Sequence, residues 1–251
     1  MEIELLLVCF GLFVISILYS SVGHGGASGY LAILSLSLYG NMESSWLKQY
    51  AWCLNLIVAA IAFYHYYLEG YFNKKLTFPF IIGSIPFAIL GGFLRIDGVI
   101  YDSLLSITLI WAAYKLYQTK KDLEIKSSIP NLKISISTGA GIGFFSGVIG
   151  VGGGIFLSPI ILLKKWANPK TVAATSALFI WVNSMAGLFG ASISGQLNLE
   201  IRILFPFVVS VLIGGFLGSK FGSKSNEGFI KLLLILVLII ASMKRMFEIF
   251  I

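Results

Sequence analysis

Charged side chains are scarce in this sequence. Of its 251 residues, 12% are charged and 57% are hydrophobic, and the mean hydropathy is +0.92. A soluble domain carries about 25% charged residues, so this composition excludes a soluble globular fold. Segments of alternating polar and apolar residues are also missing, which argues against a membrane barrel. The sequence therefore predicts an all-α polytopic membrane protein.

Cysteine and N-terminal targeting signals are equally sparse. Cys9 and Cys53 both fall in apolar runs, so we expect two lipid-buried thiols, with no disulfide, metal site or cofactor. The N-terminus, MEIELLL, is acidic, lacks a basic n-region and is followed by no small-residue cleavage site. These features predict a retained first span in place of a signal peptide.

Carboxylates are missing from the middle of every apolar run. Asp97, Asp102, Glu69 and Glu200 flank the ends of runs. Cation transporters and proton pumps carry acidic residues within the membrane, so this pattern favours a site for an anion. The net charge of +7 comes from basic residues in short loops. We interpret that charge as a topology signal and expect no nucleic-acid partner.

Ten apolar segments divide the chain. A membrane span needs about 20 residues, whereas 10–14 indicate a partial or re-entrant helix. The second and seventh segments are that short, so we expect eight full spans and two short helices. The segments are 5–20, 30–39, 46–68, 76–94, 99–117, 134–149, 155–163, 172–193, 201–217 and 229–243.

The two halves of the sequence repeat each other. Asn41 recurs as Asn168, and the triplet Phe-Pro-Phe at 78–80 recurs at 205–207, both after 127 residues. Gly-Gly-Phe-Leu at 91–94 recurs at 214–217, after 123 residues. A shared order with small changes in spacing indicates duplication. We predict a first repeat over 1–119, a polar linker over 120–133 and a second repeat over 134–251.

Basic residues indicate how the repeats are oriented. If each half has five segments, thirteen of the 18 Lys and Arg residues lie on one side of the membrane. The other five are Lys48, Arg95, Arg202, Lys244 and Arg245. If each half has four spans, the split is ten to eight and gives no orientation. The positive-inside rule favours five segments per half. That count makes the repeats inverted, with the N-terminus outside and the central loop in the cytoplasm of a cell-membrane protein.

Two glycine-rich stretches stand at equivalent places in the repeats. SVGHGGA covers 21–27 and VIGVGGG covers 148–154, and each precedes a short segment. Glycine costs about 1 kcal/mol relative to alanine inside a helix, so we expect both helices to break here. Discontinuous helices in inverted repeats place their N-termini against anionic substrates. Close packing of helices is the alternative role for such glycines.

The candidate substrate-binding residues lie in these stretches and on the neighbouring polar positions. From the stretches and their flanks we select Ser21, Gly23, His24, Gly25, Gly26, Ser28, Ser146, Gly150, Gly152, Gly153 and Gly154. From the longer segments we select Gln49, Asn55, Thr175, Ser176 and Asn183. Asn55 and Asn183 lie 128 residues apart, at nearly equivalent places. For each Ser or Thr, a hydrogen bond to its own helix is the competing role.

Histidine and serine leave two alternatives open. His24 could titrate near neutral pH and assist anion binding or proton coupling, or stay neutral on a backbone carbonyl. The run Gly26-Ala27-Ser28-Gly29 matches the Gly-x-Ser-Gly pattern of rhomboid proteases, with His65 as a conceivable base. A serine hydrolase would not need the second glycine stretch, so we expect no enzyme. GVGGG also lacks the Gly-Lys-Ser/Thr ending of a phosphate loop.

The paired stretches, the two halves and the lysine-bearing central loop resemble the TauE/SafE family, also called the sulfite exporter or TSUP family. The best motif is GVGGG at 150–154, followed by IFLSP at 155–159. The first copy is looser, with Ala27 in place of Gly154. The resemblance covers essentially the whole chain. It implies export, or sometimes uptake, of small sulfur-containing or organic anions such as sulfite and sulfonates.

We therefore expect a transporter that holds a small anion on the backbone amides of both stretches, with alternating access. Proton-coupled anion uptake is the competing transport mode. The expected partners are the anion and the lipid bilayer, and the sequence leaves open whether the protein is a monomer or a homodimer.

Overall fold

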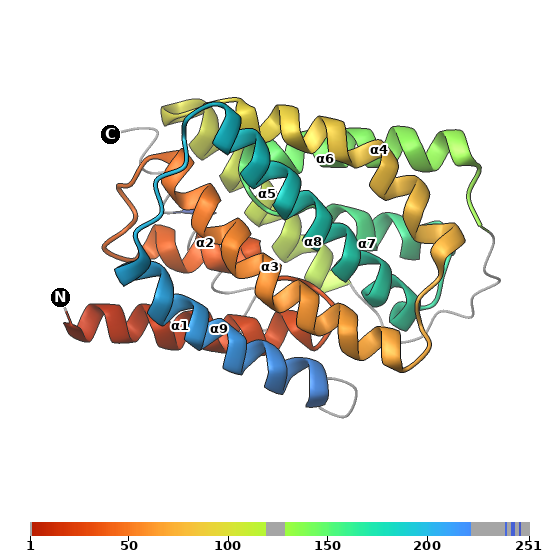
Figure 1. Ribbon diagram of the computed structural model, residues 1–251, viewed down its shortest axis with the longest axis horizontal. Helices are drawn as coiled ribbons and strands as arrows, with labels where there is room; N and C mark the ends of the chain where they lie inside the picture. Colours follow the sequence, from red (N-terminus) through yellow and green to blue (C-terminus); the bar gives the residue numbers. More distant parts are fainter. Residues whose placement is uncertain (1, 119–128, 222–238, 240–241, 244–245, 247–251) are drawn as a thin grey trace.

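The computed structural model describes residues 2–118 and 129–221, together with 239, 242, 243 and 246. Within those ranges every regular element is a helix (Figure 1). The helices are α1 (Glu2–Ser20), α2 (Ala27–Leu36), α3 (Ser44–Leu68), α4 (Lys74–Phe93), α5 (Gly98–Gln118), α6 (Leu132–Ile149), α7 (Gly154–Leu163), α8 (Pro169–Ile193) and α9 (Ile201–Phe221). Nine of the ten expected segments are thus confirmed as helices, and the tenth, 229–243, lies almost wholly outside the described residues.

Six of the described helices are long and apolar enough to cross a membrane: α1, α3, α4, α6, α8 and α9. The described part of α5 counts among the shorter apolar helices, together with α2 and α7. A ten-residue helix is about 15 Å long, half the thickness of the hydrocarbon core. The short helices after the glycine stretches therefore cannot cross alone, as expected.

The chain reverses at the first glycine stretch. The Tyr30 hydroxyl of α2 lies 3.0 Å from the Ser16 hydroxyl of α1, and a Cβ at Gly11 would meet Ile33 at 3.1 Å. Residue numbers rise on one helix as they fall on the other, so α2 runs back along α1. This arrangement excludes a single long broken helix and gives five segments in the first half.

Loops gather at two ends of the molecule (Figure 1). The loops 37–43, 94–97 and 194–200 lie at the end that holds residue 2, here named the N-terminal end. There the amide of Asn198 donates to Gln49 (2.7 Å) and that of Ser44 to Asp97 (3.1 Å). The loops 69–73 and 164–168 lie at the opposite, distal end, where Lys170 donates to Tyr71 (3.0 Å).

Helix α6 packs in parallel against α4 through glycine. A Cβ on any of three glycines of α6 would collide with a backbone carbonyl of α4. The pairs are Gly139 with Phe80, Gly143 with Ser84 and Gly147 with Ala88. Small residues let helix backbones approach closely in a membrane. Helices α1 and α9 pack in the same parallel way, with Gly214 on Phe13 and Gly218 on Ile17.

The repeated Gly-Gly-Phe-Leu motif makes equivalent contacts in both halves. Gly91 of α4 lies on α6, and Gly214 of α9 lies on α1. Gly92 lies on α8, and Gly215 lies on Val58 of α3. Exchanging the halves therefore exchanges α1–α4 with α6–α9. Equivalent helices run in opposite directions in Figure 1, which agrees with the predicted inverted repeats.

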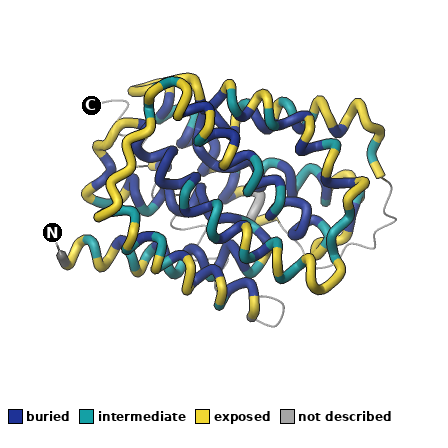
Figure 2. Tube along the Cα trace, in the orientation of Figure 1, coloured by how far each residue is buried: buried dark blue, intermediate teal, exposed yellow. Residues whose placement is uncertain are grey.

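Buried side chains form two clusters that interlock the halves. One cluster joins α1, α2, α3, α5 and α9 with Val148, Ile149 and Val151 at the second break, and includes Phe207. The other joins α4, α6, α7 and α8, and includes Phe80. Each half therefore donates its fourth helix to the cluster of the other half. Exposed residues recur along α1 and α9 (Figure 2), and many of them are large and apolar, as a lipid-facing surface requires.

Substitutions at two glycines of α6 can distinguish the effect of close helix packing from the effect of helix propensity. A Cβ at Gly143 would lie 2.8 Å from Ser84 Cα, whereas Gly141 faces open space. We expect Gly143→Leu to force α4 and α6 apart and to cost about 3 kcal/mol of unfolding free energy or more. Gly141→Leu should be neutral or stabilise by up to about 1 kcal/mol. Thermal unfolding of both variants in detergent checks this, and equal melting temperatures would contradict the packing role.

Candidate functional site

Each glycine stretch ends one helix and begins a short one. Helix α1 ends at Ser20 and α2 begins at Ala27, while α6 ends at Ile149 and α7 begins at Gly154. The residues before the short helices, Gly26 and Gly153, have φ of 106° and 85°. Residues that carry a side chain rarely adopt this left-handed backbone conformation. Repeat-equivalent glycines therefore perform the same turn in both halves.

The two stretches converge on the same two side chains. A Cβ at Gly25 would lie 2.5 Å from Asn55 Oδ1 and 2.8 Å from Ile180 Cγ2. A Cβ at Gly152 would lie 2.6 Å from Asn55 Nδ2 and 2.9 Å from Ile180 Cγ2. Asn55 belongs to α3 and Ile180 to α8, and both are buried. The carboxamide of Asn55 thus lies between the breaks, at the contact of the two repeats.

Both short helices begin without a side-chain cap. Their N-caps, Gly26 and Gly153, make no side-chain hydrogen bond, and neither first turn contains an acidic residue. The first N–H groups of a helix have no partner within the helix, and the helix dipole places about half a positive charge there. Each break therefore presents N–H donors and a partial positive charge, which together favour an anion.

Two buried polar atoms without hydrogen-bond partners belong to side chains at the breaks: Asn55 Oδ1 beside Gly25, and Ser146 Oγ, whose side chain lies by Gly153. Among the described residues, Asn183 Oδ1 on α8 and Trp52 Nε1 on α3 are also buried without a partner. Asn55 also donates to Ser184 Oγ (3.3 Å), and Asn183 donates to the Phe179 carbonyl (2.8 Å). Leaving such groups unpaired costs about 1–3 kcal/mol each. The residues around Gly25, Gly152 and Gly153, with Asn55 and Ser146 among them, are here named the polar centre. An anion could accept a hydrogen bond from the Ser146 hydroxyl but not from Asn55 Oδ1, which is itself an acceptor.

Other predicted site residues already form hydrogen bonds with other groups of the protein. Each of the following contacts satisfies a candidate hydroxyl or amide, so these side chains stabilise helix contacts and do not join the polar centre. The contacts are Ser28 with Tyr19 (2.7 Å), Ser176 with Ser158 (2.6 Å), Thr175 with Thr77 (2.9 Å), Gln49 with Asn198 (2.7 Å) and Ser21 with Leu18 (2.7 Å).

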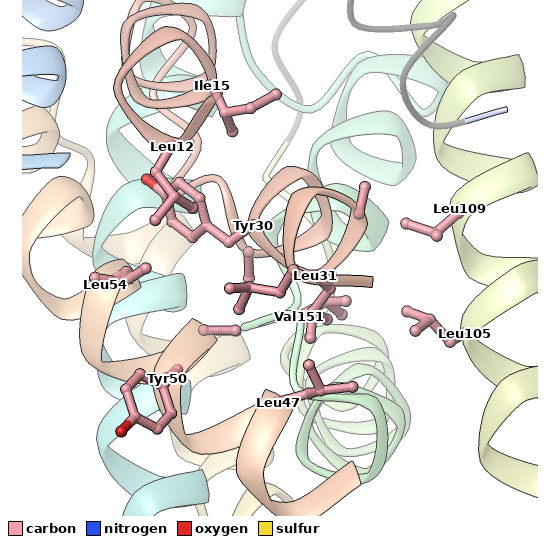
Figure 3. Packing of buried hydrophobic residues seen from close by; sticks show 14 of the residues in the cluster. Leu12, Ile15, Tyr30, Leu31, Leu47, Tyr50, Leu54, Leu105, Leu109 and Val151 are labelled. Carbon is pink, nitrogen blue, oxygen red and sulfur yellow. The ribbon is translucent and has the colours of Figure 1, made fainter. Parts of the chain in front are cut away.

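The remaining predicted glycines lie around this centre. Gly23 packs on Ala173, and Gly150 on Lys48, both with left-handed φ. Gly154 packs on Ile180. His24 lies within the first break, with Nδ1 3.0 Å from the Val22 carbonyl. Its repeat counterpart, Val151, is instead part of the apolar core beside Leu31 and Leu47 (Figure 3).

Sequence reasoning missed three residues of the centre: Ile180, Ser184 and Tyr30. The Tyr30 hydroxyl donates to the Gly25 carbonyl (2.8 Å) and so holds the first break in place. Ile180 carried no sequence signal, because an apolar residue in a span is ordinary.

The residues proposed for hydrolysis are not paired with each other. Ser28 Oγ lies 2.7 Å from the Tyr19 hydroxyl, while His65 Nδ1 lies 2.8 Å from Ser219 Oγ. A serine hydrolase requires its nucleophile within hydrogen-bond reach of a base. The described residues also contain no group of three or more His, Cys, Asp or Glu placed to hold a metal ion.

A matched pair of glycines tests the central packing. Gly152 and Gly70 have φ of 74° and 79°, but only Gly152 has neighbours where a Cβ would stand. We expect Gly70→Ala to lose about 1 kcal/mol from backbone strain. Gly152→Ala should lose a further 1–3 kcal/mol, roughly, through overpacking against Asn55 and Ile180. Denaturant or thermal unfolding measures both, and an equal loss would remove Gly152 from a tightly packed centre.

Comparison with known proteins identifies the family. The model of the sulfite exporter TauE/SafE family matches residues 7–245. A "Probable membrane transporter protein y4hK" from Sinorhizobium fredii is 33% identical over 249 residues, covering 97% of this chain and 99% of the relative. A "Probable membrane transporter protein MJ0441" from Methanocaldococcus jannaschii is 29% identical over 161 residues, covering 62% and 60% of the two chains. No solved structure matches. The chain belongs to the sulfite exporter TauE/SafE family and is a membrane transporter, not an enzyme.

Proposed function

We propose that this transporter carries a small sulfur-containing or organic anion, such as sulfite or a sulfonate, out of the cell. The observation that carries the proposal is the convergence of two uncapped helix N-termini on one buried asparagine. A sulfite or sulfonate group has three oxygens that accept hydrogen bonds in different directions. Such a group can accept hydrogen bonds from the N–H groups of both breaks at once. It can also accept one from the second Nδ2 proton of Asn55, since Ser184 takes only the first.

The charge of the buried residues favours an anion over a cation. Among the described residues, the buried polar side chains are hydroxyls, amides and a single lysine, with no carboxylate. Intramembrane carboxylates are the usual sign of a sodium or proton site. Backbone N–H groups donate hydrogen bonds and provide no lone pair that could bind a cation. The selectivity of the centre therefore comes from donors held in a fixed geometry.

Transport requires this packed centre to open. A methyl group does not fit at Gly25 or Gly152 without displacing Asn55 or Ile180, so an anion enters only when the neighbouring helices separate. The two buried clusters are the bodies that we propose to move, one built mainly from α1–α3, α5 and α9 and the other from α4 with α6–α8, with Val148, Ile149 and Val151 packed into the first. Rocking of one cluster against the other would expose the centre to each side in turn.

The first transport prediction concerns driving force. Moving one charge through 100 mV is worth about 2.3 kcal/mol, or roughly fiftyfold in concentration. The cell interior is negative, so a monoanion is driven outward without a coupled ion. In proteoliposomes, sulfite or methanesulfonate flux should follow an imposed potential at equal pH on both sides. His24→Ala should reduce this flux at most partly, because His24 tunes affinity and carries no obligatory proton.

The competing proton-coupled uptake predicts the reverse dependence. Flux would then follow a pH gradient, ignore the potential and disappear in His24→Ala. Gly25→Leu is the matched loss-of-site control. It places a bulky side chain against Asn55 and should abolish flux while the protein remains inserted. Wild-type flux in Gly25→Leu would exclude the first glycine stretch from the site.

The second prediction concerns orientation. Basic residues of the described chain concentrate at the distal end, where Lys74, Lys75, Lys133, Lys164, Lys165, Lys170 and Lys220 lie. By the positive-inside rule this end is cytoplasmic. In a background with Cys9 and Cys53 replaced by alanine, a membrane-impermeant thiol reagent should label Asn198→Cys in intact cells and miss Lys164→Cys. Labelling of both, or of Lys164→Cys alone, would contradict this orientation.

A further inference from the structure

Lys48 is the one charged side chain that is buried among the described residues, with 1% of its surface exposed. It lies in the second turn of α3, one residue after Leu47, which packs beside Val151 in Figure 3. The Lys48 stem contacts the second glycine stretch directly, since a Cβ at Gly150 would lie 2.8 Å from Lys48 Cγ. A buried cation thus touches one of the two helix breaks.

Among the described residues, the ammonium group of Lys48 donates one hydrogen bond, to the Leu94 carbonyl at 3.2 Å. No carboxylate oxygen of the described residues lies within 4 Å of it, because the nearby acids pair with Arg95 instead. Arg95 contacts Glu43 at 2.8 Å and Asp97 at 2.9 Å. An ammonium has three donors, and a buried charge is costly unless it is paired. Lys48 therefore has the chemistry of a cation that lacks its anion.

The neighbouring carboxylate is fully engaged elsewhere. Asp97 accepts hydrogen bonds from the Ser44 amide (3.1 Å) and from Arg95. Burial alone would raise the pKa of Asp97, but the hydrogen bonds from Ser44 and Arg95 outweigh it, so the pKa lies below its usual value. Asp97 is thus held as a loop-stabilising anion and does not neutralise Lys48 by contact.

Lys48 also stands between a cavity and the polar centre. At the N-terminal end a cavity of about 460 Å³ is lined by Asn41, Glu43, Ser44, Arg95, Asp97 and Tyr101, among others. Ser44 begins α3, and Lys48, Trp52 and Asn55 follow it at spacings of four, four and three residues. Such spacings place side chains on one face of a helix. The cavity, the cation and the asparagine therefore succeed one another along α3.

We infer that Lys48 forms an anion subsite between the cavity at the N-terminal end and the centre at Asn55. This inference rests on the proposed function. An anion that passes between the cavity and the centre replaces the Leu94 carbonyl as the hydrogen-bond partner of the Lys48 ammonium. The same charge rejects cations on this path, a selection that backbone amides alone make less strongly. Capping of the α4 C-terminus, where lysine commonly bonds the last carbonyls, is the competing structural role.

Stability measurements with and without anion separate the two roles. The probes are sulfite and methanesulfonate, and the variants are Lys48→Met, Lys48→Gln and Lys48→Arg. Lys170→Met is the matched control, because it removes an exposed lysine bonded to Tyr71 at the opposite end. Without anion, Lys48→Met should melt at or above the wild-type temperature, since it removes an unpaired buried charge. The rise in melting temperature that either probe gives the wild type should vanish.

Transport by the same variants gives the second readout. Sulfite or methanesulfonate flux at low concentration should fall about tenfold or more in Lys48→Met and Lys48→Gln, as expected for losing a charge-assisted hydrogen bond. Lys48→Arg and Lys170→Met should retain most of it. Lys48→Gln keeps a donor for Leu94 without the charge, so it reports on the subsite even if Lys48→Met fails to fold.

The outcomes distinguish this subsite from the transporter's proposed function. A lower melting temperature in Lys48→Met with an undiminished response to anion would make Lys48 a cap of α4 and overturn the inference alone. If Lys48→Met and Lys170→Met lost the same share of anion response and flux, the effect would come from the overall charge of the protein. That result would also overturn the inference. A wild-type protein that neither binds nor moves either probe would overturn the proposed function, and the subsite with it.

Discussion

A helix that breaks inside a membrane must have its freed backbone groups enclosed by protein, and the rest of this structure follows from that constraint. Lipid offers no hydrogen bonds, and irregular backbone survives at membrane depth only inside protein or beside a water-filled cavity. The glycines of both breaks are accordingly buried, and Gly25 and Gly152 lie between Asn55 of α3 and Ile180 of α8. These two helices, of 25 residues each, are the longest described and form the wall that both breaks share.

Enclosing two breaks at once explains the exchange of helices between the halves. Each half has a break, a short helix and a long helix, and its own fourth helix packs away from them. The fourth helix of the other half closes the cluster instead, which is why Phe80 and Phe207 fall in opposite clusters. Gly143 lies against the backbone of α4, and Gly214 lies against the backbone of α1. These close contacts allow the exchanged helices, α4 and α9, to cover the clusters of the other half. The two halves thus form one interlocked body, and its buried clusters follow packing and not sequence order.

Most of this fold could be predicted from the sequence, because hydrophobic length and glycine clusters are local signals. Segment limits, the two breaks and the short helices all depend on residues close in the chain. The site was predicted less well. Hydroxyls such as Ser28 and Thr175 find partners on other helices, and no local pattern reveals that. Ile180 and Ser184 reach the centre only through the packing of α8 against both breaks.

The two repeats are equivalent in backbone but not in charge. Lys48 on α3 has Ser176 as its counterpart on α8 at the spacing of 128 residues that relates Asn55 to Asn183, and Ser176 is paired with Ser158. In the proposed transport, the two paths to the centre would therefore differ, one lined by a cation and the other by hydroxyls. This asymmetry would change how strongly each side holds an anion, but it could not set the direction of net flow in a carrier without a coupled ion. A site stabilises an anion equally whichever way the anion arrives, so the direction of the proposed uncoupled flux would follow from the membrane potential and the anion gradient alone.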